Sequence, residues 1–389
     1  MIIVDNPYLS NFLKETITSS GIAVLDTLVS KKFGIDPASK IIDENSAITK
    51  FKDDPNFRLY TTSENALGWV VDKLADTKLP NWINLFKNKV KFRQLISNLY
   101  PDFMFKEILF KDLKNFDINA MSFPFILKPS VGFFSLGVKK IDSAEQWLAI
   151  LDQIEKEMLE AVKHFPKQVL NASNFILEQY IEGDEYAVDA YFDQNGEAVI
   201  LGIYQHVFSS SSDVSDRMYL TSRKIIQDNI DDFSEILKQI STLTSIRNFP
   251  LHIEVRKDSE GTVIPIEVNP LRFGGWCTTA DLTHHAFDFN PYEYYFNNIK
   301  PDWDKILTDK EDIYSIIILD NSTGLKANQI ASFDYDQLLK QFEKTLELRE
   351  IDYHKFPLFG FLFTQTKPAN FAELDKILKS DLLEFIQQV

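Results

Sequence analysis

Cysteine is nearly absent from the sequence, whose single thiol belongs to Cys277. No disulfide can therefore form within the chain, which fits a reducing compartment. Long apolar runs are also missing, because stretches such as Ile316–Leu319 are far shorter than the roughly 20 residues that cross a bilayer. The first residues, Met1–Asp5, lack the basic and apolar segments of a secretory signal. We therefore expect a cytoplasmic protein.

Positive charge is in short supply as well. The 389 residues include 41 lysines and arginines against 57 aspartates and glutamates, which gives a formal net charge of -16. Long-range repulsion from such a chain disfavours binding to nucleic acid and to anionic membranes. A polyanionic ligand must therefore be met by cations gathered at one local site. We expect small-molecule partners, with no nucleic-acid and no membrane partner.

The first part of the chain lacks the glycine turn of dinucleotide-binding enzymes. Residues 2–4 read as a buried strand, 9–18 as a helix and 22–25 as a second strand, which predicts α/β layering. The turn after the first strand reads Asn-Pro-Tyr rather than GxGxxG, so a nicotinamide cofactor is disfavoured. We expect a Rossmann-like first domain.

Two changes in the sequence pattern divide the rest of the chain. A helix expected at 87–99 is stopped by Pro101, and short β-rich runs separated by glycine turns begin after Phe123-Pro124. Alternating patterns predict an α/β tail, with strands at 314–319 and 358–363 and helices at 335–348 and 371–386. The predicted fold class is thus α/β and α+β. The predicted domains are 1–85, 86–300 (with a lid at about 120–182) and 301–389.

A loop bordered by two glycines follows a lysine. Residues 125–138 read as a strand containing Lys128, a loop between Gly132 and Gly137, and a second strand. Glycines let the loop turn its amides toward a phosphate, and Lys128 adds a point charge. Lys89, in the first turn of the preceding helix, can strengthen an anion site at that helix end. A simple β-hairpin with exposed lysines explains the same residues. The interpretation as a phosphate-binding loop therefore depends on the other motifs.

A second motif, at 174–188, reads as an apolar strand, an acidic turn around Gly183 and another strand. An extended hinge of this kind can offer a backbone carbonyl and amide to the edge of adenine. Glu185, seven residues after Glu178, can accept hydrogen bonds from ribose hydroxyls. A solvated acidic turn is an equally good interpretation of the pattern.

The most informative segment is a predicted hairpin of two alternating strands, 251–256 and 264–269. With the turn centred on Glu260-Gly261, Glu254 lies directly opposite Glu267, at about 5 Å between Cβ atoms, where like charges destabilise the pair. A divalent cation such as Mg²⁺, which prefers oxygen ligands, would relieve this repulsion, and Asn269 can add an amide oxygen. Arg256 and Arg272 would face the same cleft and hold a substrate carboxylate or the γ-phosphate.

Taken together, these motifs resemble the ATP-grasp superfamily, as in D-alanine-D-alanine ligase and biotin carboxylase. The resemblance is carried, in the same order, by Lys89 and by the runs FILKPS (125–130), LEQYI (177–181) and IEVNPLR (266–272). It covers about residues 85–295 and implies an ATP-grasp fold, with ATP held between two α+β subdomains. A Rossmann-like domain would precede this fold, and a small α/β extension would follow it.

By position, the resemblance implies roles for individual residues. The residues that would bind ATP are Lys89, Lys128, Gly132, Ser135, Glu178, Gln179, Tyr180, Ile181 and Glu185. Glu254, Glu267 and Asn269 would hold one or two Mg²⁺ ions, with Mn²⁺ as an alternative, and Arg272 would steady the acyl phosphate.

We therefore expect an ADP-forming ligase that activates a carboxylate as an acyl phosphate for attack by an amine or similar nucleophile. Two alternatives stay open: an ATP-binding regulatory protein without turnover, and an ATP-dependent phosphotransferase. The substrates do not follow from the sequence, because neither the serine-rich run 209–213 nor the tail matches a ligase substrate loop. The oligomeric state does not follow from the sequence either, although a homodimer is compatible with it. Cys277 is expected to be a packing residue, and four histidines are candidate general bases by type only: His206, His252, His284 and His285.

Overall fold

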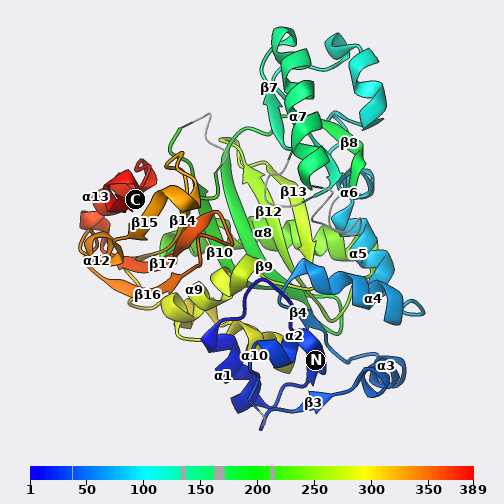
Figure 1. The fold of residues 1–389 in the computed structure, drawn as a ribbon. Helices are drawn as coiled ribbons and strands as arrows, with labels where there is room; N and C mark the ends of the chain where they lie inside the picture. The colour runs from blue at the N-terminus through cyan, green and yellow to red at the C-terminus, as the bar shows by residue number, and fades with distance from the viewer. Residues whose placement is uncertain (37, 133–136, 162–170, 211–214) are drawn as a thin grey trace.

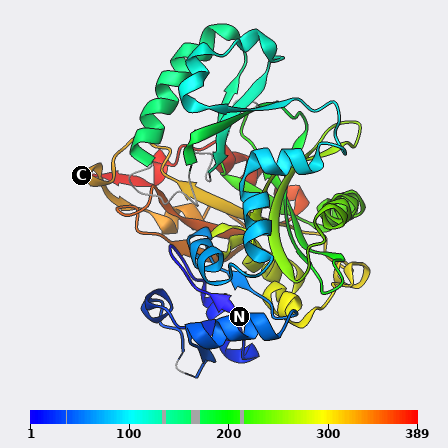
Figure 2. The ribbon, with the colours of Figure 1, turned by 90° about the vertical axis from the view of Figure 1, so that its right-hand side faces the viewer.

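The computed structural model of the protein describes residues 1–36, 38–132, 137–161, 171–210 and 215–389. Within these ranges the strands form four sheets. Figure 1 shows the N-terminal segment at the bottom, a large sheet in the middle and a smaller lid of strands and helices at the top. Turned by 90°, the lid stands above the large sheet (Figure 2). Among the described helices, none combines the length and apolar content that a membrane span needs.

The N-terminal segment contains a parallel sheet with the strand order β3-β2-β1-β4. Its strands are β1 (Ile2–Ile3), β2 (Val24–Leu25), β3 (Ile41–Ile42) and β4 (Tyr60–Thr61), and its helices are α1 (Asn11–Ser20), α2 (Leu28–Lys32), α3 (Glu44–Asp53), α4 (Leu67–Lys73) and α5 (Leu79–Lys87). Helix α1 begins after Ser10, whose hydroxyl accepts from the Leu13 amide, and ends at Gly21, which is left-handed at φ 61°. The expected α/β layering of this region is confirmed.

The lid is an antiparallel sheet with the order β5-β8-β6-β7. Helix α6 (Lys89–Ile96) leads into it, and its elements are β5 (Phe105–Leu109), β6 (Phe125–Val131), β7 (Lys139–Ile141), α7 (Trp147–Ala161) and β8 (Asn171–Gln179). Its apolar side chains form a core separate from the main one, centred on Phe125, Leu127, Trp147 and Phe175. On strand β6, Leu127 points into this core, so Lys128 points away from it.

The large antiparallel sheet has the order β13-β12-β9-β10-β11-β14-β17-β16. Its strands are β9 (Asp184–Phe192), β10 (Ala198–Val207), β11 (Met218–Thr221), β12 (Phe249–Lys257), β13 (Val263–Pro270), β14 (Ile313–Asp320), β16 (Thr345–Glu350) and β17 (Leu358–Thr366). Tyr186 packs against Phe233 of α8 (Arg223–Thr244), so alternation places its neighbour Glu185 on the opposite face. Alternation and mutual contacts place Glu185 and Asp189 of β9 with His252, Glu254 and Arg256 of β12 on the face that α8 does not cover.

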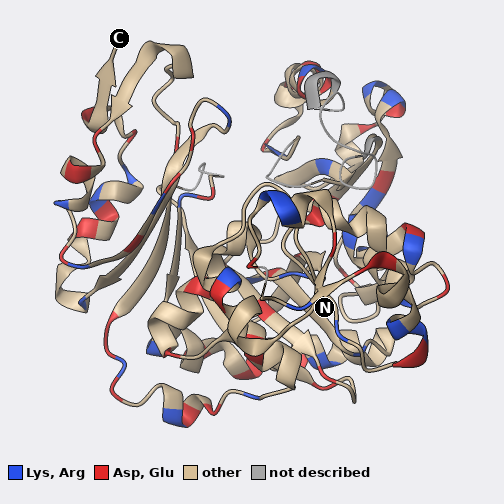
Figure 3. Cartoon of the chain, turned by 60° about the horizontal axis from the view of Figure 1, so that its bottom comes forward, with Lys and Arg blue, Asp and Glu red and all other residues tan. Residues whose placement is uncertain are grey.

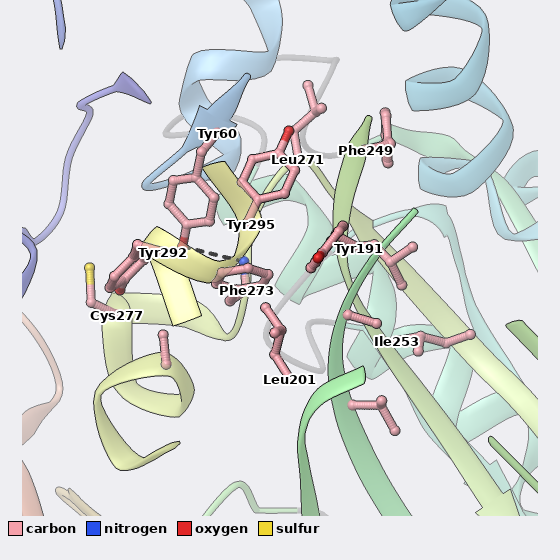
Figure 4. Close-up of a cluster of buried hydrophobic side chains, with 14 of the residues drawn as sticks. Tyr60, Tyr191, Leu201, Phe249, Ile253, Leu271, Phe273, Cys277, Tyr292 and Tyr295 are labelled. Atoms are coloured by element: carbon pink, nitrogen blue, oxygen red, sulfur yellow. Dashed lines mark hydrogen bonds between the residues drawn. The ribbon is translucent and has the colours of Figure 1, made fainter. Parts of the chain in front are cut away.

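Helix α9 (Thr278–Phe287) follows β13 and packs against β10 and β14, and it is succeeded by α10 (Pro291–Asn297) and α11 (Trp303–Ile306). Aromatic side chains from the N-terminal segment, β9 and these helices form one cluster (Figure 4). Within it, the Phe273 amide donates to the Tyr60 hydroxyl at 3.3 Å. The main core thus joins the N-terminal segment to the large sheet.

The tail differs from its expected pattern in two places. The helix expected at 335–348 is wrong beyond Leu339: α12 is Tyr335–Leu339, and the alternating residues that follow form β16, paired with β17. The helix expected at 371–386 is wrong beyond Leu378: α13 is Ala372–Leu378, and the left-handed Leu382 (φ 65°) redirects the chain. Two short strands, β15 (Ile330–Phe333) and β18 (Ile386–Gln388), then pair with each other.

Candidate functional site

The acidic hairpin has the register that its alternation predicts. Glu254 on β12 pairs directly with Glu267 on β13, and a bulge follows Glu254. Burial and the adjacent charge of Glu267 raise the pKa of Glu254 well above its usual range. Burial would raise the pKa of Glu267 too, but the Lys89 ammonium, 2.7 Å away, holds it far below that range. The two carboxylates are therefore paired but only partly buried, with the side chains of Glu254 and Glu267 25% and 19% exposed, and Lys89 offsets the charge on the Glu267 side.

Asn269, the third expected metal ligand, lies beside them. Its amide nitrogen donates to Glu267 Oε1 at 3.3 Å, and the residue is 4% exposed. Two facing carboxylates and an amide fit the oxygen preference of a hard divalent cation, and such a cation would offset the repulsion within the pair. Across the described part of the chain, no group of three or more His, Cys, Asp or Glu side chains is arranged to hold a metal. An ion here would therefore need further oxygens, such as those of phosphates.

Three buried lysines approach this hairpin. Lys89 and Lys87 each place Nζ 3.4 Å from the carbonyl oxygen of Gly132, where the glycine loop begins. Lys128 lies on β6 and is 4% exposed. Lysines are rarely buried without a partner, so three together are a marked concentration of charge in an acidic chain. In Figure 3 lysines and arginines are otherwise mixed with acidic residues along the chain.

The glycine loop itself is only partly described. Gly137, at its end, is left-handed at φ 70°, which fits the expected use of glycine there. Gly132 is placed by its contacts with the two lysines. Ser135, an expected phosphate contact, lies outside the described residues.

Arg272 is anchored by a residue of the N-terminal segment that the sequence did not single out. Glu64, in a short 3-10 turn η1 (Glu64–Ala66), accepts from Arg272 Nη2 at 2.8 Å and from Lys87 Nζ at 2.6 Å. Burial opposes the charge of Glu64, but Lys87 and Arg272 lower its pKa. Lys87 could have been noticed, because it lies two residues before Lys89. Glu64 gave no such signal, because its partners are distant in the sequence.

Glu178, an expected adenine contact, has its side chain fully engaged by cations. Arg93 Nε and Lys128 Nζ lie 2.7 Å and 2.6 Å from its two carboxylate oxygens. Burial alone would raise its pKa, but these cations lower it to about 2. Arg93 also donates to the Pro265 carbonyl on β13, so one buried group joins α6, the lid and the large sheet.

The hinge strands β8 and β9 belong to different sheets and do not form a hairpin. The amides of Gln179 and Tyr180 donate to backbone carbonyls of Met104 and Pro124. The Ile181 carbonyl accepts from Arg256 Nη1 at 2.7 Å. An adenine edge would therefore have to use other backbone atoms of 179–181.

Glu185, the expected ribose carboxylate, accepts from His206 Nδ1 and Arg256 Nε, both at 2.9 Å. Burial raises its pKa, but His206 and Arg256 together lower it. The Arg256 guanidinium also lies 5.1 Å from the centre of the Tyr180 ring. The structure thus places Arg256 at the hinge, and its expected role on a γ-phosphate stays a prediction.

Of the four histidine candidates, His252 lies nearest the acidic hairpin. Its Nδ1 is 2.7 Å from the buried Asp189 carboxylate, and its Nε2 is 3.8 Å from Glu254. The other three lie at different positions: His206 at Glu185, His284 stacked on Phe12 and His285 at Glu347. Cys277 is buried, and burial raises its thiol pKa to about 11, which fits a packing residue.

Comparisons with known proteins identify the fold. Residues 121–280 match the family model of the ATP-grasp domain. The L-amino acid ligase of Bacillus licheniformis has a similar structure, with a TM-score of 0.68 at 17% identity over 100% of this chain and 98% of that one. Biotin carboxylase of Campylobacter jejuni has a TM-score of 0.64 at 12% identity, over 100% and 91% of the two chains.

The N5-carboxyaminoimidazole ribonucleotide synthetase of Thermotoga maritima has a TM-score of 0.62 at 15% identity, over 100% and 98% of the two chains. No curated protein matches the sequence significantly. The expected fold class and the resemblance on which it was based are thereby confirmed.

Proposed function

Since the chain carries an ATP-grasp domain and has the ATP-grasp fold, we propose that it is an ATP- and Mg²⁺-dependent ligase. It would convert a carboxylate into an acyl phosphate and pass the acyl group to an amine or a similar nucleophile. The observation that carries this proposal is the meeting of Lys87, Lys89 and Lys128 with the facing pair Glu254 and Glu267. Cations for phosphate oxygens thus adjoin oxygen ligands for a divalent ion.

In this proposal Lys89 and Lys128 bind the phosphates of ATP, and the loop from Ser130 to Gly137 covers them. The backbone of 179–181 contacts adenine, and Glu185 accepts from the ribose. Glu178 acts indirectly, because its carboxylate fixes the ammonium of Lys128 at 2.6 Å. The pairing of Glu178 with Lys128 and Arg93 keeps all three charges buried without an unpaired carboxylate.

Glu254, Glu267 and Asn269 would hold the Mg²⁺. When bound, the ion would neutralise charge that develops during phosphoryl transfer. Without it, Lys89 already neutralises Glu267, whereas Glu254 remains partly buried next to a like charge. The donor set therefore supports binding of an ion together with the nucleotide.

The reaction would proceed in two steps. A carboxylate oxygen of the substrate attacks the γ-phosphorus, and the bond to the β-phosphate oxygen breaks to release ADP. An amine then attacks the acyl carbon, and inorganic phosphate leaves as the amine loses a proton. Arg272, which pairs with Glu64 at 2.8 Å, would bind the carboxylate or the acyl phosphate through its remaining donors.

Phosphate release in mixtures of carboxylates and amines, with mass analysis of the products, tests the proposal. Amino acids are the first choice for both substrates, because one similar structure is an L-amino acid ligase. An amide product formed with one ADP per bond supports the ligase. A phosphorylated product without an amide supports a phosphotransferase, and binding without turnover in every mixture supports a regulatory protein.

A substitution at the acidic hairpin adds a direct control. Glu267→Gln removes a proposed ion ligand but keeps the size of the side chain, so turnover should fall by at least about a hundredfold. The fold should persist, because glutamine keeps an oxygen acceptor for Lys89 and the change relieves the repulsion with Glu254. Wild-type turnover in this variant would contradict the assigned role of Glu267.

A further inference from the structure

The segment 271–277, which we call the Arg272 loop, connects β13 to α9 through strained backbone. Leu271, Trp276 and Cys277 adopt positive φ angles of 61°, 57° and 59°. Residues with a Cβ are strained in this region and persist there only where surrounding contacts hold them. The conformation that presents Arg272 therefore depends on groups outside the loop.

Two parts of the molecule hold the first half of this loop. From the N-terminal segment, the Thr61 amide donates to the Leu271 carbonyl at 2.7 Å, and the Tyr60 hydroxyl accepts from Phe273. From β9, the buried carboxylate of Asp189 accepts from the Gly274 amide at 3.0 Å. These bonds hold Leu271, Phe273 and Gly274, and they do not reach the strained residues Trp276 and Cys277.

The second half of the loop is held from the tail. Arg349 lies on β16, more than seventy residues after the loop, and is 4% exposed. Its Nη1 donates to the Trp276 carbonyl at 3.2 Å, and its Nη2 donates to Asp281 of α9 at 2.6 Å. Its Nε donates to Glu347 at 2.6 Å, and its guanidinium lies 4.4 Å from the centre of the Phe363 ring. One side chain thus binds the strained loop, the helix that follows it and the sheet below.

The pairing with Asp281 makes this contact hard to replace. Asp281 is 1% exposed, and burial raises its pKa to about 6 even with the arginine in place. Removing Arg349 would leave a buried carboxylate without its cation and the Trp276 carbonyl without this donor. Strain at Trp276 and Cys277 could then relax by a change of the loop backbone.

We propose that Arg349 is a positioning residue for Arg272. It holds the Trp276 carbonyl and Asp281, and so keeps the Arg272 loop in the conformation that pairs Arg272 with Glu64. The tail strand β16 thereby contributes to the site without touching the reacting atoms. The effect on catalysis rests on the proposed ligase function, whereas the effect on the loop does not.

Hydrogen–deuterium exchange of peptides covering 271–278 tests the proposal in the nucleotide-free protein. In Arg349→Met, exchange at Phe273 and Gly274 should rise at least tenfold, and Arg349→Lys should show a smaller rise. The matched control is Arg217→Met, which removes another buried arginine from its carboxylate partner, the partly exposed Asp320 at 2.7 Å. That variant should leave exchange in the loop at the wild-type rate.

Kinetics then separate positioning from substrate contact. In Arg349→Met, kcat should fall at least tenfold while the KM for ATP stays unchanged. Unaltered loop exchange, or an equal rise in Arg217→Met, overturns the proposal, and so does a loosened loop with wild-type kcat. A higher KM for the carboxylate at unchanged kcat also overturns it, because Arg349 would then bind substrate.

Two remaining cases are covered by the same design. If Arg349→Met does not fold, the exchange and kinetics of Arg349→Lys test the proposal instead. Loop exchange equal to that of the wild type in Arg349→Lys would then overturn it. If the wild-type protein turns over no mixture of carboxylate and amine, the ligase function fails on its own. The exchange comparison still decides whether Arg349 holds the loop.

Discussion

Glu254 faces Glu267 across β12 and β13, and the ammonium of Lys89 binds Glu267 at 2.7 Å. The charge of the pair is therefore offset on one side only. Burial and the neighbouring carboxylate raise the pKa of Glu254, whereas Lys89 keeps Glu267 ionised. A site of this kind trades stability for ligand binding, because Glu254 gains a favourable partner only when a cation arrives.

This trade predicts opposite effects of Glu254→Gln on stability and on activity. The pKa of Glu254 is higher in the folded protein than its ordinary value of 4.5. Glu254 therefore lowers the stability of the fold as the pH rises from 4.5 through this folded-state pKa. At pH 8, without nucleotide or metal, Glu254→Gln should therefore raise the melting temperature. The same change should remove Mg²⁺-dependent turnover. Melting curves and phosphate release check both, with the exposed Glu260→Gln in the hairpin turn as a control that should change neither.

Lys89 and Lys91 provide a matched comparison on one helix. Lys89 is 7% exposed and binds Glu267, whereas Lys91 is exposed. Losing a charge-assisted bond to phosphate costs about 1.5–3 kcal/mol, so Lys89→Met should weaken an ATP analogue by about 10- to 100-fold. Lys91→Met should leave its affinity unchanged. Calorimetric titration with a non-hydrolysable analogue and Mg²⁺ measures both, and equal losses would remove Lys89 from the proposed phosphate site.

Glu178 should make the stability of the protein sensitive to acid. Its pKa is about 2 in the fold against an ordinary value of 4.5, so its contribution is complete above pH 4.5 and is lost as pH falls toward 2. A shift of this size corresponds to about 3 kcal/mol. Glu178→Gln should therefore be less stable than the wild type at pH 6, by an amount that shrinks at pH 3. Denaturant unfolding at both pH values tests this, and the exposed Glu182→Gln should show no such convergence.

The adjacent glycines Gly274 and Gly275 of the Arg272 loop should differ sharply in how well they tolerate substitution by alanine. A Cβ added to Gly274 would lie 2.3 Å from the Thr279 hydroxyl oxygen, whereas one added to Gly275 would meet nothing within 4 Å. Overpacking of this kind typically costs about 1–3 kcal/mol. Gly274→Ala should therefore lower the melting temperature and the turnover, and Gly275→Ala should be close to wild type in both. Two equally tolerated substitutions would show that the loop backbone is less constrained than its contacts indicate.

Local pattern was enough to predict the acidic hairpin and its register. Strict alternation and a turn at Glu260-Gly261 leave one pairing that puts Ile253 and Val255 on a common face, and this pairing sets Glu254 against Glu267. The lysines and the hinge were recognisable because each lies inside a short motif. Their assigned roles in binding remain predictions.

Partners distant in the sequence could not be predicted in the same way. Arg93 binds Glu178 across 85 residues, and Glu64 binds Arg272 across 208. No local sequence pattern predicts such pairs, because only the folded arrangement of the N-terminal segment, the lid and the large sheet brings the partners together. The tail shows the opposite failure: residues 345–348 were expected to end a helix, but they alternate in polarity and pair with β17 as part of strand β16.

The large sheet runs without interruption from the acidic hairpin into the tail, where β14 pairs with β11. A shortened version of the protein that stops near residue 300 would strip β11 of this neighbour and leave its amides and carbonyls open to solvent. Such an edge invites pairing with other molecules, so the shortened protein should self-associate rather than behave as a compact catalytic fragment.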